Sequence, residues 1–492
     1  MWEARLTQFV LPVFLFSGHM LPVIGTLLGF LFFAAATVIL AKWYALPQKK
    51  LVWVIFSLLI VLHPYVCSQL YYAHSVVSVF AWHFCSVAGV VFLWDFIDNK
   101  RFLLLLAGCL LLLIALCGYA ACIELMLTIA VGKFLSDVSA LKRISITFVK
   151  KYFYFFGLIS VSFGVYAGII FGLKKIGVIN VGMYNTQSLP LLGVLHKISV
   201  DWYRPFDVLT TALPYSSWLS AVCIIACFLL CLCTVRENKI LCVGGIVCLI
   251  YAMFCVAYIS PQDVFRMFRV HSYSVPYFAA ILFALVWQNG KKIHKNIIFA
   301  LGVMLIFLFV KADVTAQKIW YLGNVQDEAI VERMKKDLLP ELKKGMHYRL
   351  STIGNLYGRQ KFAGVRFVSD EKRETYKEYW GAPYFLAILF SAGFWAYEAE
   401  NPIWGDAMYI GDSVFYGTSN ENIYLENIIT AGIFAMYFGD DKKELNLRLR
   451  KLKPFPQKPY YTIGGKDIFL MMENNNSNKV KLFDKMQNES AH

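Results

Sequence analysis

Apolar and polar positions divide this chain into two parts. Ten apolar segments fill most of residues 18–312, whereas residues 313–492 mix polar and apolar positions. A helix needs about 20 apolar residues to cross the hydrocarbon core of a bilayer, so the pattern predicts a polytopic α-helical membrane protein of about 10 spans. The spans are expected at residues 18–41, 51–66, 76–96, 102–117, 120–135, 152–173, 214–234, 240–258, 271–289 and 296–312.

Two further segments qualify this pattern. Residues 102–117 and 120–135 form either two spans joined by a tight turn at Gly118 or one long bent helix. Residues 5–16 are apolar but too short to span, and they fit a helix lying along the membrane interface. The start of the chain lacks the charged, cleavable pattern of a signal peptide. The composition, 58% hydrophobic and 16% charged, supports a membrane protein because soluble globular proteins rarely reach such values.

Lysine and arginine in short loops predict the orientation. One set of loops is rich in them: Lys42, Lys49, Lys50, Lys100, Arg101, Lys133, Lys142, Arg143, Lys150, Lys151, Arg236, Lys239, Lys291, Lys292 and Lys295. The alternate set has fewer: Lys174, Lys175, Lys197, Arg204, Arg266 and Arg269. We therefore expect the first set in the cytoplasm. Loops 63–75, 174–213 and 259–270, the N-terminus and the C-terminal block would face outward.

The net charge of +15 partly reflects these loops. We interpret it as attraction to anionic lipid headgroups of the bilayer rather than to nucleic acid, because no nucleic-acid motif accompanies it. The sequence therefore predicts the lipid bilayer as a partner and no nucleic acid.

The C-terminal block predicts an extracytoplasmic α/β domain at residues 313–472, followed by a disordered polar tail at 473–492. The expected elements are an amphipathic helix at 325–345 closed by Gly345, strands at 347–354 and 364–370, an apolar helix at 383–397 and a hairpin at 461–472 built on Gly464 and Gly465. We favour 383–397 as a core element of the domain over a helix lying on the membrane.

The cysteines give little chemistry. All 12 lie between Cys67 and Cys255, mostly inside predicted spans, without the tight tetrahedral spacing of a metal site. We interpret them as buried small apolar residues. No P-loop, HExxH, CxxC or GxSxG in a suitable context is present, so we predict neither a cofactor nor a metal.

Polar side chains gather in two of the outward loops. Loop 174–213 holds His196, Lys197, Asp201, Trp202, Tyr203, Arg204 and Asp207, and residues 263–271 add Asp263, Arg266, Arg269 and His271. A carboxylate can take a proton from a hydroxyl, and arginines with histidine can hold a phosphate. A plainer interpretation makes the aromatic residues interfacial anchors, pairs Arg204 with Asp207, and sets Arg266 and Arg269 against lipid phosphates.

Ionisable residues also occur inside predicted spans. Glu124 lies in GYAACIELML, where a carboxylate is costly and needs a partner; it is either functional, in a re-entrant segment, or packed on polar neighbours. His63, His74 and His83 line an outward-facing stretch, and a lone membrane histidine is more often hydrogen-bonded within the bundle than catalytic.

Five stretches carry a resemblance to a known family: HPYVCSQLYYAHSVVSVFAWHF (63–84), GYAACIELMLTIAVGKFL (118–135), GVYAGIIFGLKKIGVINVGMYNTQ (164–187), VFRMFRVHSYSVPYFAAILFAL (264–285) and KPFPQKPYYTIGGKDIFLMM (453–472). In their order they resemble the type II serotype-converting glucosyltransferases. That family adds glucose to the O-antigen of lipopolysaccharide from polyprenyl-phosphate glucose. Each match is loose, so the chain resembles a distant member.

The resemblance implies a hexosyltransferase of the type C membrane glycosyltransferases, in the bacterial inner (plasma) membrane, with an outward-facing active site. Its partners would be a polyprenyl-phosphate-linked sugar donor and a polysaccharide acceptor, with a flippase and a lipid-linked-sugar synthase upstream. The expected base is Asp201 or Asp207, with Asp263 third. The donor phosphate would be bound by Arg204, Arg266, Arg269 and His271. We expect the C-terminal block to hold the acceptor glycan through Trp395, Tyr397 and Trp404.

The chain departs from the family at two places. The family begins with one more span and an acidic outer loop, whereas this chain opens at MWEARLTQF, and the added span would give a cytoplasmic start. His74 and Ser75 stand where members often carry an acid. The remaining outer-face carboxylates are Glu3, Asp201, Asp207 and Asp263. Three alternatives follow: a sequence short at its start, a relocated base, or an inactive chain.

Two rival functions compete with this prediction. A polysaccharide polymerase or ligase would join two lipid-linked glycans, although such enzymes seldom end in a large folded outer domain. A transporter or assembly subunit would be non-catalytic. A transporter typically shows broken helices or repeats with polar residues at the midplane, and beyond Glu124 the sequence has few.

Overall fold

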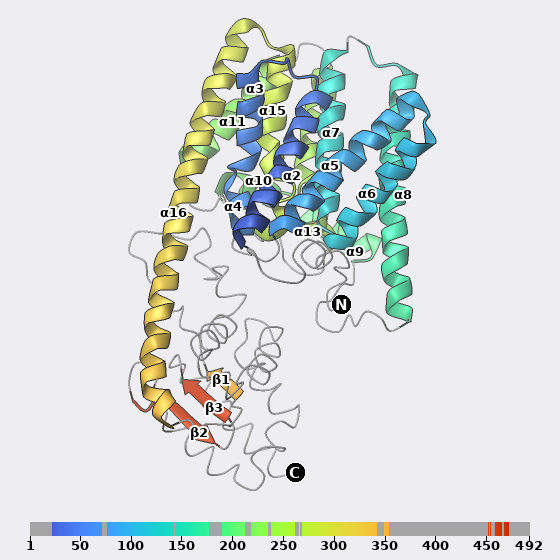
Figure 1. The fold of residues 1–492 in the computed structure, drawn as a ribbon. Coiled ribbons are helices and arrows are strands. Elements are labelled where there is room, and N and C mark those ends of the chain that lie inside the picture. Colours follow the sequence, from blue (N-terminus) through green and yellow to red (C-terminus); the bar gives the residue numbers. More distant parts are fainter. Residues whose placement is uncertain are drawn as a thin grey trace. The chain divides into compact units, whose positions relative to one another are not determined.

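The computed structural model divides the chain into two compact units, Met1–Ala316 and Gln317–His492. Each is described separately (Figure 1). The described residues are 22–70, 76–141, 143–176, 189–211, 218–234, 238–260, 265, 268–341, 349–353, 451, 453, 458–464 and 467–471.

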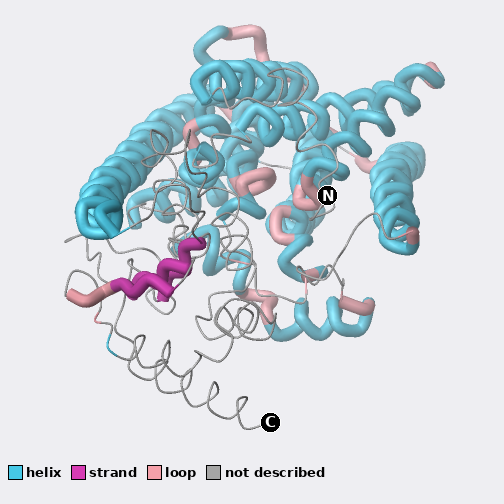
Figure 2. The backbone as a smooth tube through the Cα atoms, turned by 60° about the horizontal axis from the view of Figure 1, so that its bottom comes forward, coloured by secondary structure: helices cyan, strands magenta, loops and turns pink. Residues whose placement is uncertain are grey.

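The regular elements described in the first unit are all helical (Figure 2). They are α2 (Pro22–Trp43), α3 (Lys50–Val61), α4 (Pro64–Leu70), α5 (Val76–Asn99), α6 (Phe102–Gly118), α7 (Cys122–Ala140), α8 (Ile146–Lys175), α9 (Leu191–Val200), α10 (Arg204–Thr211), α11 (Trp218–Thr234), α12 (Lys239–Ala252), α13 (Cys255–Ile259), α14 (Phe268–His271), α15 (Pro276–Asn289) and the first part of α16 (Lys292–Leu338), which continues into the second unit. Each predicted apolar segment contains helix.

Within the described part of the chain, four helical stretches are long and apolar enough to cross a membrane. They are Val23–Trp43 of α2, Val76–Asn99 of α5, Ile146–Leu173 of α8 and Lys292–Val314 of α16. The other apolar helices described are shorter, so the structure agrees with an α-helical, membrane-embedded protein and leaves the count of ten spans a prediction.

The first unit is built around α5. Helix α5 packs against both α2 and α6, and 78% of its most apolar stretch is buried, against 17% for α8. Close approach of α5 and α6 depends on Gly89 and Gly108: a Cβ atom at Gly108 would lie 3.1 Å from the Gly89 carbonyl oxygen. Small residues of this kind let helix backbones pack tightly. Helix α5 is therefore central, whereas α8 exposes apolar side chains such as Phe153 and Phe171.

A sharp turn separates α6 from α7. Helix α6 ends at Gly118 and α7 begins at Cys122, so this region forms two helices rather than one long bent one. A Cβ atom at Gly118 would lie 2.1 Å from Cε2 of Trp82, a distance that no side chain could tolerate. Glycine at this position lets the end of α6 meet the indole on α5.

The described part of the second unit contains the end of α16, a 3-10 turn (Leu339–Glu341) and three short strands. These are β1 (Arg349–Ile353), β2 (Tyr461–Gly464) and β3 (Asp467–Met471), in the order β1-β3-β2. Strand β3 pairs in parallel with β1 and antiparallel with β2. The predicted strand at 347–354 and hairpin at 461–472 are confirmed. The predictions at 364–370, 383–397 and 473–492 lie outside the described residues.

The boundaries predicted for the helix at 325–345 are wrong. Helix α16 runs without a break from Lys292 to Leu338, and the turn that follows contains Pro340. Proline lacks a backbone N–H and disfavours the helical conformation of the residue before it, which explains why the helix ends ahead of Gly345. Its last turn is tied to the residues just before β2, because Asp337 accepts hydrogen bonds from Tyr460 and from Lys458, at 2.7 and 2.6 Å.

Candidate functional site

A buried polar segment joins α14 to α15. It comprises residues His271–Tyr277 and is called here the hub segment. Its histidine and two serines are completely buried, and its two tyrosines are 1% exposed. Helix α14 ends at His271, and α15 starts at Pro276, which suits a first helical position because its missing N–H would be unpaired there anyway. The break between the two helices leaves four consecutive residues, 272–275, outside regular helix, where their polar groups can point to neighbouring helices.

The hub segment contacts several helices. Gln69 of α4 donates a hydrogen bond to the Ser272 hydroxyl. The Tyr273 ring stacks on His83 of α5 with centroids 4.5 Å apart, and Nδ1 of the same histidine lies 3.0 Å from the Tyr277 hydroxyl oxygen. His83 is thus hydrogen-bonded within the bundle, as predicted for a lone membrane histidine. These contacts fix the segment where α4, α5 and α15 meet.

Glu124 is the carboxylate at the centre of this region. It lies in the first turn of α7, and its side chain is 0% exposed. Its Oε2 atom lies 3.0 Å from His271 Nδ1 and 3.1 Å from Ser274 Oγ, and its Oε1 accepts a hydrogen bond from the Val256 backbone N–H at 3.1 Å. A carboxylate buried among apolar groups is tolerated when hydrogen-bonded in this way. The prediction that Glu124 needs partners is therefore confirmed.

The donor from Val256 exists because α12 is interrupted. Helix α12 stops at Ala252 and α13 starts at Cys255, so Val256 lies in a first turn whose N–H groups have no intrahelical partner. The freed carbonyl of Met253 accepts a hydrogen bond from the Ser274 hydroxyl at 2.8 Å. The interruption therefore frees a backbone N–H, which bonds to Glu124, and a backbone carbonyl, which bonds to Ser274.

A second group of polar residues gathers at the turn between α9 and α10, where α9 contacts α13, and is called here the α9–α10 corner. Asp201 Oδ1 and Arg204 Nε form an ion pair at 3.0 Å, and the Asp201 carbonyl accepts a hydrogen bond from the Tyr258 hydroxyl at 3.1 Å. Lys197 donates to the Ser260 carbonyl at 2.8 Å. Helices α4, α9 and α13 lie at one end of the helical bundle, its lower end in the view of Figure 1.

Phe265 connects this corner to the loop that precedes the hub segment. The Arg204 guanidinium carbon lies 5.5 Å from its ring centroid, and the Lys197 ammonium lies 5.7 Å from it. Both are distances at which a cation is attracted to an aromatic face. Phe265 stands directly before Arg266 in the sequence. The corner therefore brings residues 197–204 next to Tyr258, Ser260 and Phe265.

The structure describes some of the predicted site residues and not others. Asp201 and Arg204 lie together, with side chains 15% and 33% exposed. His271 is buried on Glu124. Asp207 lies on α10 and Arg269 on α14, but the positions of their side chains are outside the description. The residues outside the described ranges are Asp263, Arg266, Trp395, Tyr397 and Trp404.

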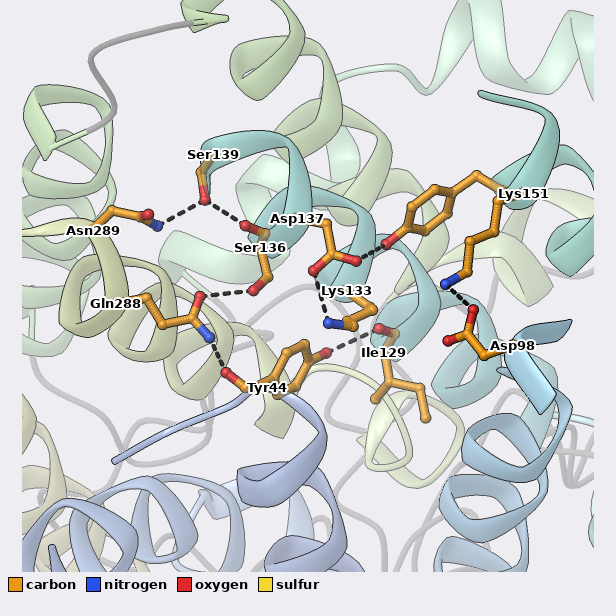
Figure 3. Close-up of polar contacts among 11 residues, drawn as sticks. Tyr44, Asp98, Ile129, Lys133, Ser136, Asp137, Ser139, Lys151, Gln288 and Asn289 are labelled. Carbon is orange, nitrogen blue, oxygen red and sulfur yellow. Dashed lines mark hydrogen bonds and ion pairs between the residues drawn. The ribbon is translucent and has the colours of Figure 1, made fainter. Parts of the chain in front are cut away.

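The opposite end of the bundle holds a polar network centred on Asp137 of α7, called here the Asp137 network (Figure 3). Asp137 accepts from Lys133 and from the Tyr152 hydroxyl, each at 2.7 Å. Ser136 donates to Gln288 at 2.7 Å, which in turn donates to the Tyr44 carbonyl. Lys133 was predicted as a basic loop residue that sets the topology, whereas it lies within α7. Its spacing of four residues from Asp137 on a helix was the sign of a pair.

Lysine and tryptophan strengthen this end of the bundle. Lys151 of α8 pairs with Asp98 of α5 at 2.5 Å, and its ammonium lies 3.9 Å from the centroid of the Trp94 ring. The Lys133 ammonium lies 5.7 Å from the same ring. Every charged group in these contacts has an opposite charge beside it, which indicates an anchoring role.

Comparison of the chain with protein-family models, with curated proteins and with solved structures finds no match. The functional interpretation therefore depends on the residues and geometry described above.

Proposed function

We propose that the chain is an integral-membrane glycosyltransferase that moves a sugar, glucose by the family resemblance, from a polyprenyl-phosphate donor to a surface polysaccharide such as O-antigen. The observation that carries this proposal is the α9–α10 corner. There, residues 197–204, with their basic and acidic side chains, meet Tyr258 and Phe265, and Phe265 is close in sequence to Arg266, Arg269 and His271. Cations beside carboxylates at one end of an apolar helical bundle suit a reaction on a lipid-linked phosphate.

The proposed topology has ten spans in a bacterial plasma membrane. The shorter apolar helices α3, α6, α11 and α12 would cross together with the adjoining turns or short helices. The basic loops would face the cytoplasm, and the α9–α10 corner and the unit that starts at Gln317 would face outward, following the distribution of lysine and arginine. In the second unit the described sheet would belong to an α/β domain that binds the acceptor glycan, with Trp395, Tyr397 and Trp404 stacking on sugars.

The proposed reaction is a displacement at the anomeric carbon. The acceptor hydroxyl loses its proton to a carboxylate, and its oxygen forms a bond to that carbon. The bond from carbon to the phosphate oxygen breaks, and polyprenyl phosphate leaves with the electron pair. Asp201, Asp207 or Asp263 is the proposed base. Arg266, Arg269, Arg204 and His271 would bind the phosphate and stabilise its growing charge.

Arg269→Ala tests the proposal. Transfer of labelled glucose from polyprenyl-phosphate glucose should be abolished in membranes that contain this variant, because a cation opposite the leaving phosphate is lost. Arg101→Ala is the matched control: Arg101 is an exposed arginine that precedes α6, and its loss should leave transfer unchanged. Full activity of Arg269→Ala at equal protein level would contradict the assignment.

A further inference from the structure

Helix α9 carries its large apolar side chains on the outside of the bundle. Leu191, Leu192 and Leu195 are 74%, 80% and 53% exposed, and none of the ten residues of the helix is buried. These three leucines are called here the α9 leucine face. Apolar side chains gathered on one exposed surface mark a site of contact with a partner or with a membrane.

The polar contacts of α9 lie on the side away from the leucine face. At about 3.6 residues per turn, Lys197 projects from the opposite side of the helix. Its ammonium donates to the Ser260 carbonyl at 2.8 Å, and just before the helix the Leu189 N–H donates to the Ile259 carbonyl at 2.9 Å. Both acceptors stand at the end of α13. The helix is therefore held to α13 by its polar side and turns its leucines away from that contact.

Helix α9 lies at one end of the helical bundle. It contacts α13, and the Val256 N–H of α13 bonds to Glu124 in the first turn of α7. Figure 1 shows α9 and α13 at the same end of the bundle. A helix of ten residues is about 15 Å long, which is too short to cross a hydrocarbon core of about 30 Å. An apolar face at this level therefore suits the interface of a bilayer rather than its centre.

Two exposed aromatic residues follow α9 directly. They are Trp202 and Tyr203, and the Trp202 carbonyl accepts a hydrogen bond from the Tyr251 hydroxyl of α12 at 3.0 Å. Tryptophan and tyrosine are enriched where a membrane meets water, with their rings at the level of the lipid headgroups. The pair therefore marks the headgroup level beside α9, where reagents dissolved in water still reach.

Two features favour lipid over protein as the occupant of the leucine face. Helix α8, which precedes α9 in the chain, is apolar enough to cross a membrane, and its Phe171 is 69% exposed near the same end of that helix as the connection to α9. The one hydroxyl on α9 needs no outside partner, because Ser199 donates to the His196 carbonyl of its own helix at 2.7 Å. The leucine face thus continues an apolar outer surface and asks for no polar contact.

We propose that α9 is an interfacial helix whose leucine face inserts among the acyl chains of phospholipids, in the leaflet at this end of the bundle. Its partner is therefore a lipid surface, and its role is to hold the α9–α10 corner at the depth of the headgroups. The inference goes beyond the proposed function and does not depend on it, because it holds for any chemistry at the corner and for either orientation of the chain.

Photo-crosslinking of the purified full-length chain tests the inference. Benzoylphenylalanine replaces Leu192, and the protein is placed in nanodiscs of phosphatidylcholine and phosphatidylglycerol that contain tritiated phosphatidylcholine. Illumination should attach labelled lipid to the chain, because the photoreactive group couples to C–H bonds that lie against it. The same replacement of Phe171 on α8 is the positive control. Gln48, an exposed residue between α2 and α3, is the matched control at a loop position and should give little label.

The outcomes separate the possible occupants. Lipid label at Leu192 comparable with that at Phe171, and well above that at Gln48, is the expected result. A crosslinked dimer would identify a second copy of the chain, and a crosslink to a peptide of the unit that starts at Gln317 would identify that unit; either result would overturn the inference. Absence of a lipid adduct at Leu192 would overturn it as well. If the Leu192 variant does not fold, the same replacement of Leu195 provides the test with the same outcomes.

Discussion

Glu124 and Asp137 lie on the same helix, and their surroundings differ. Thirteen residues separate them on α7, which places them about 20 Å apart along the helix axis. Glu124 is fully buried, and its printed partners are a histidine, a serine and a backbone N–H. Asp137 keeps 27% of its side chain exposed and is paired with a lysine and a tyrosine.

This difference separates two uses of a carboxylate. Asp137 keeps contact with solvent and has a lysine beside it, so its charge is neutralised at low cost and it can serve as an anchor. Glu124 has been taken out of water completely, with a titratable imidazole as its counter-group, which is a costly arrangement. In apolar helical bundles, a fully buried ionisable group marks a functional region more often than a partly exposed ion pair does.

The comparison predicts that the two ends of the bundle lie on opposite sides of the membrane. A cysteine introduced at Trp202, which is 58% exposed in the α9–α10 corner, should react in intact cells with a thiol reagent that does not cross membranes. A cysteine at Arg101 should react only after the membrane is opened. Labelling is measured as the increase over the unmodified chain, and equal labelling of both positions in intact cells would remove the topological basis of the comparison.

Removing the two carboxylates should have unequal effects on stability. Glu124→Ala should lower the free energy of unfolding by about 3 kcal/mol or more, because it strands buried donors. Asp137→Ala should cost about 1 kcal/mol, because its partners are closer to solvent. Thermal unfolding of the two purified variants in one detergent measures the order, and a larger loss at Asp137 would reverse the account.

The smallest effect on stability is expected from a substitution at Thr128, which lies between Glu124 and Asp137 in the sequence. Thr128 lies on α7 and is fully buried, and its hydroxyl has no hydrogen-bond partner among the described residues. Thr128→Val replaces that hydroxyl by a methyl group of similar volume, so its stability should stay within about 0.5 kcal/mol of the unmodified chain or rise slightly. The same unfolding measurement checks this value. A loss comparable to that of Glu124→Ala would indicate that Thr128 belongs to the buried polar cluster.

Local pattern predicted a good part of this structure. The apolar segments gave the positions of the helices in the first unit, and the strand at 349–353 and the hairpin at 461–471 followed from short-range alternation. The parallel pairing of β1 with β3 could not be predicted, since the two strands are more than a hundred residues apart. The continuous helix α16 was predicted as two helices because its side chains change from apolar to charged along its length. The helical backbone continues through that change.

The candidate site was predicted less well, for a physical reason. The sequence showed that Glu124 required a partner, but His271 is 147 residues away and no local spacing connects them. The plainer interpretation of the sequence paired Arg204 with Asp207, three residues after it, whereas the structure shows an ion pair with Asp201, three residues before it. The contact between the Arg204 guanidinium and the Phe265 ring depends on the packing of α9 against α13. No short sequence pattern predicts that packing.

The central claim is that this chain transfers a sugar from a lipid-linked phosphate. The direct measurement is the transfer of radiolabelled glucose from polyprenyl-phosphate glucose to cell-surface polysaccharide, in membranes with and without the protein. The account predicts labelling that depends on the protein. Equal labelling in both preparations, with the protein present and folded, would contradict it.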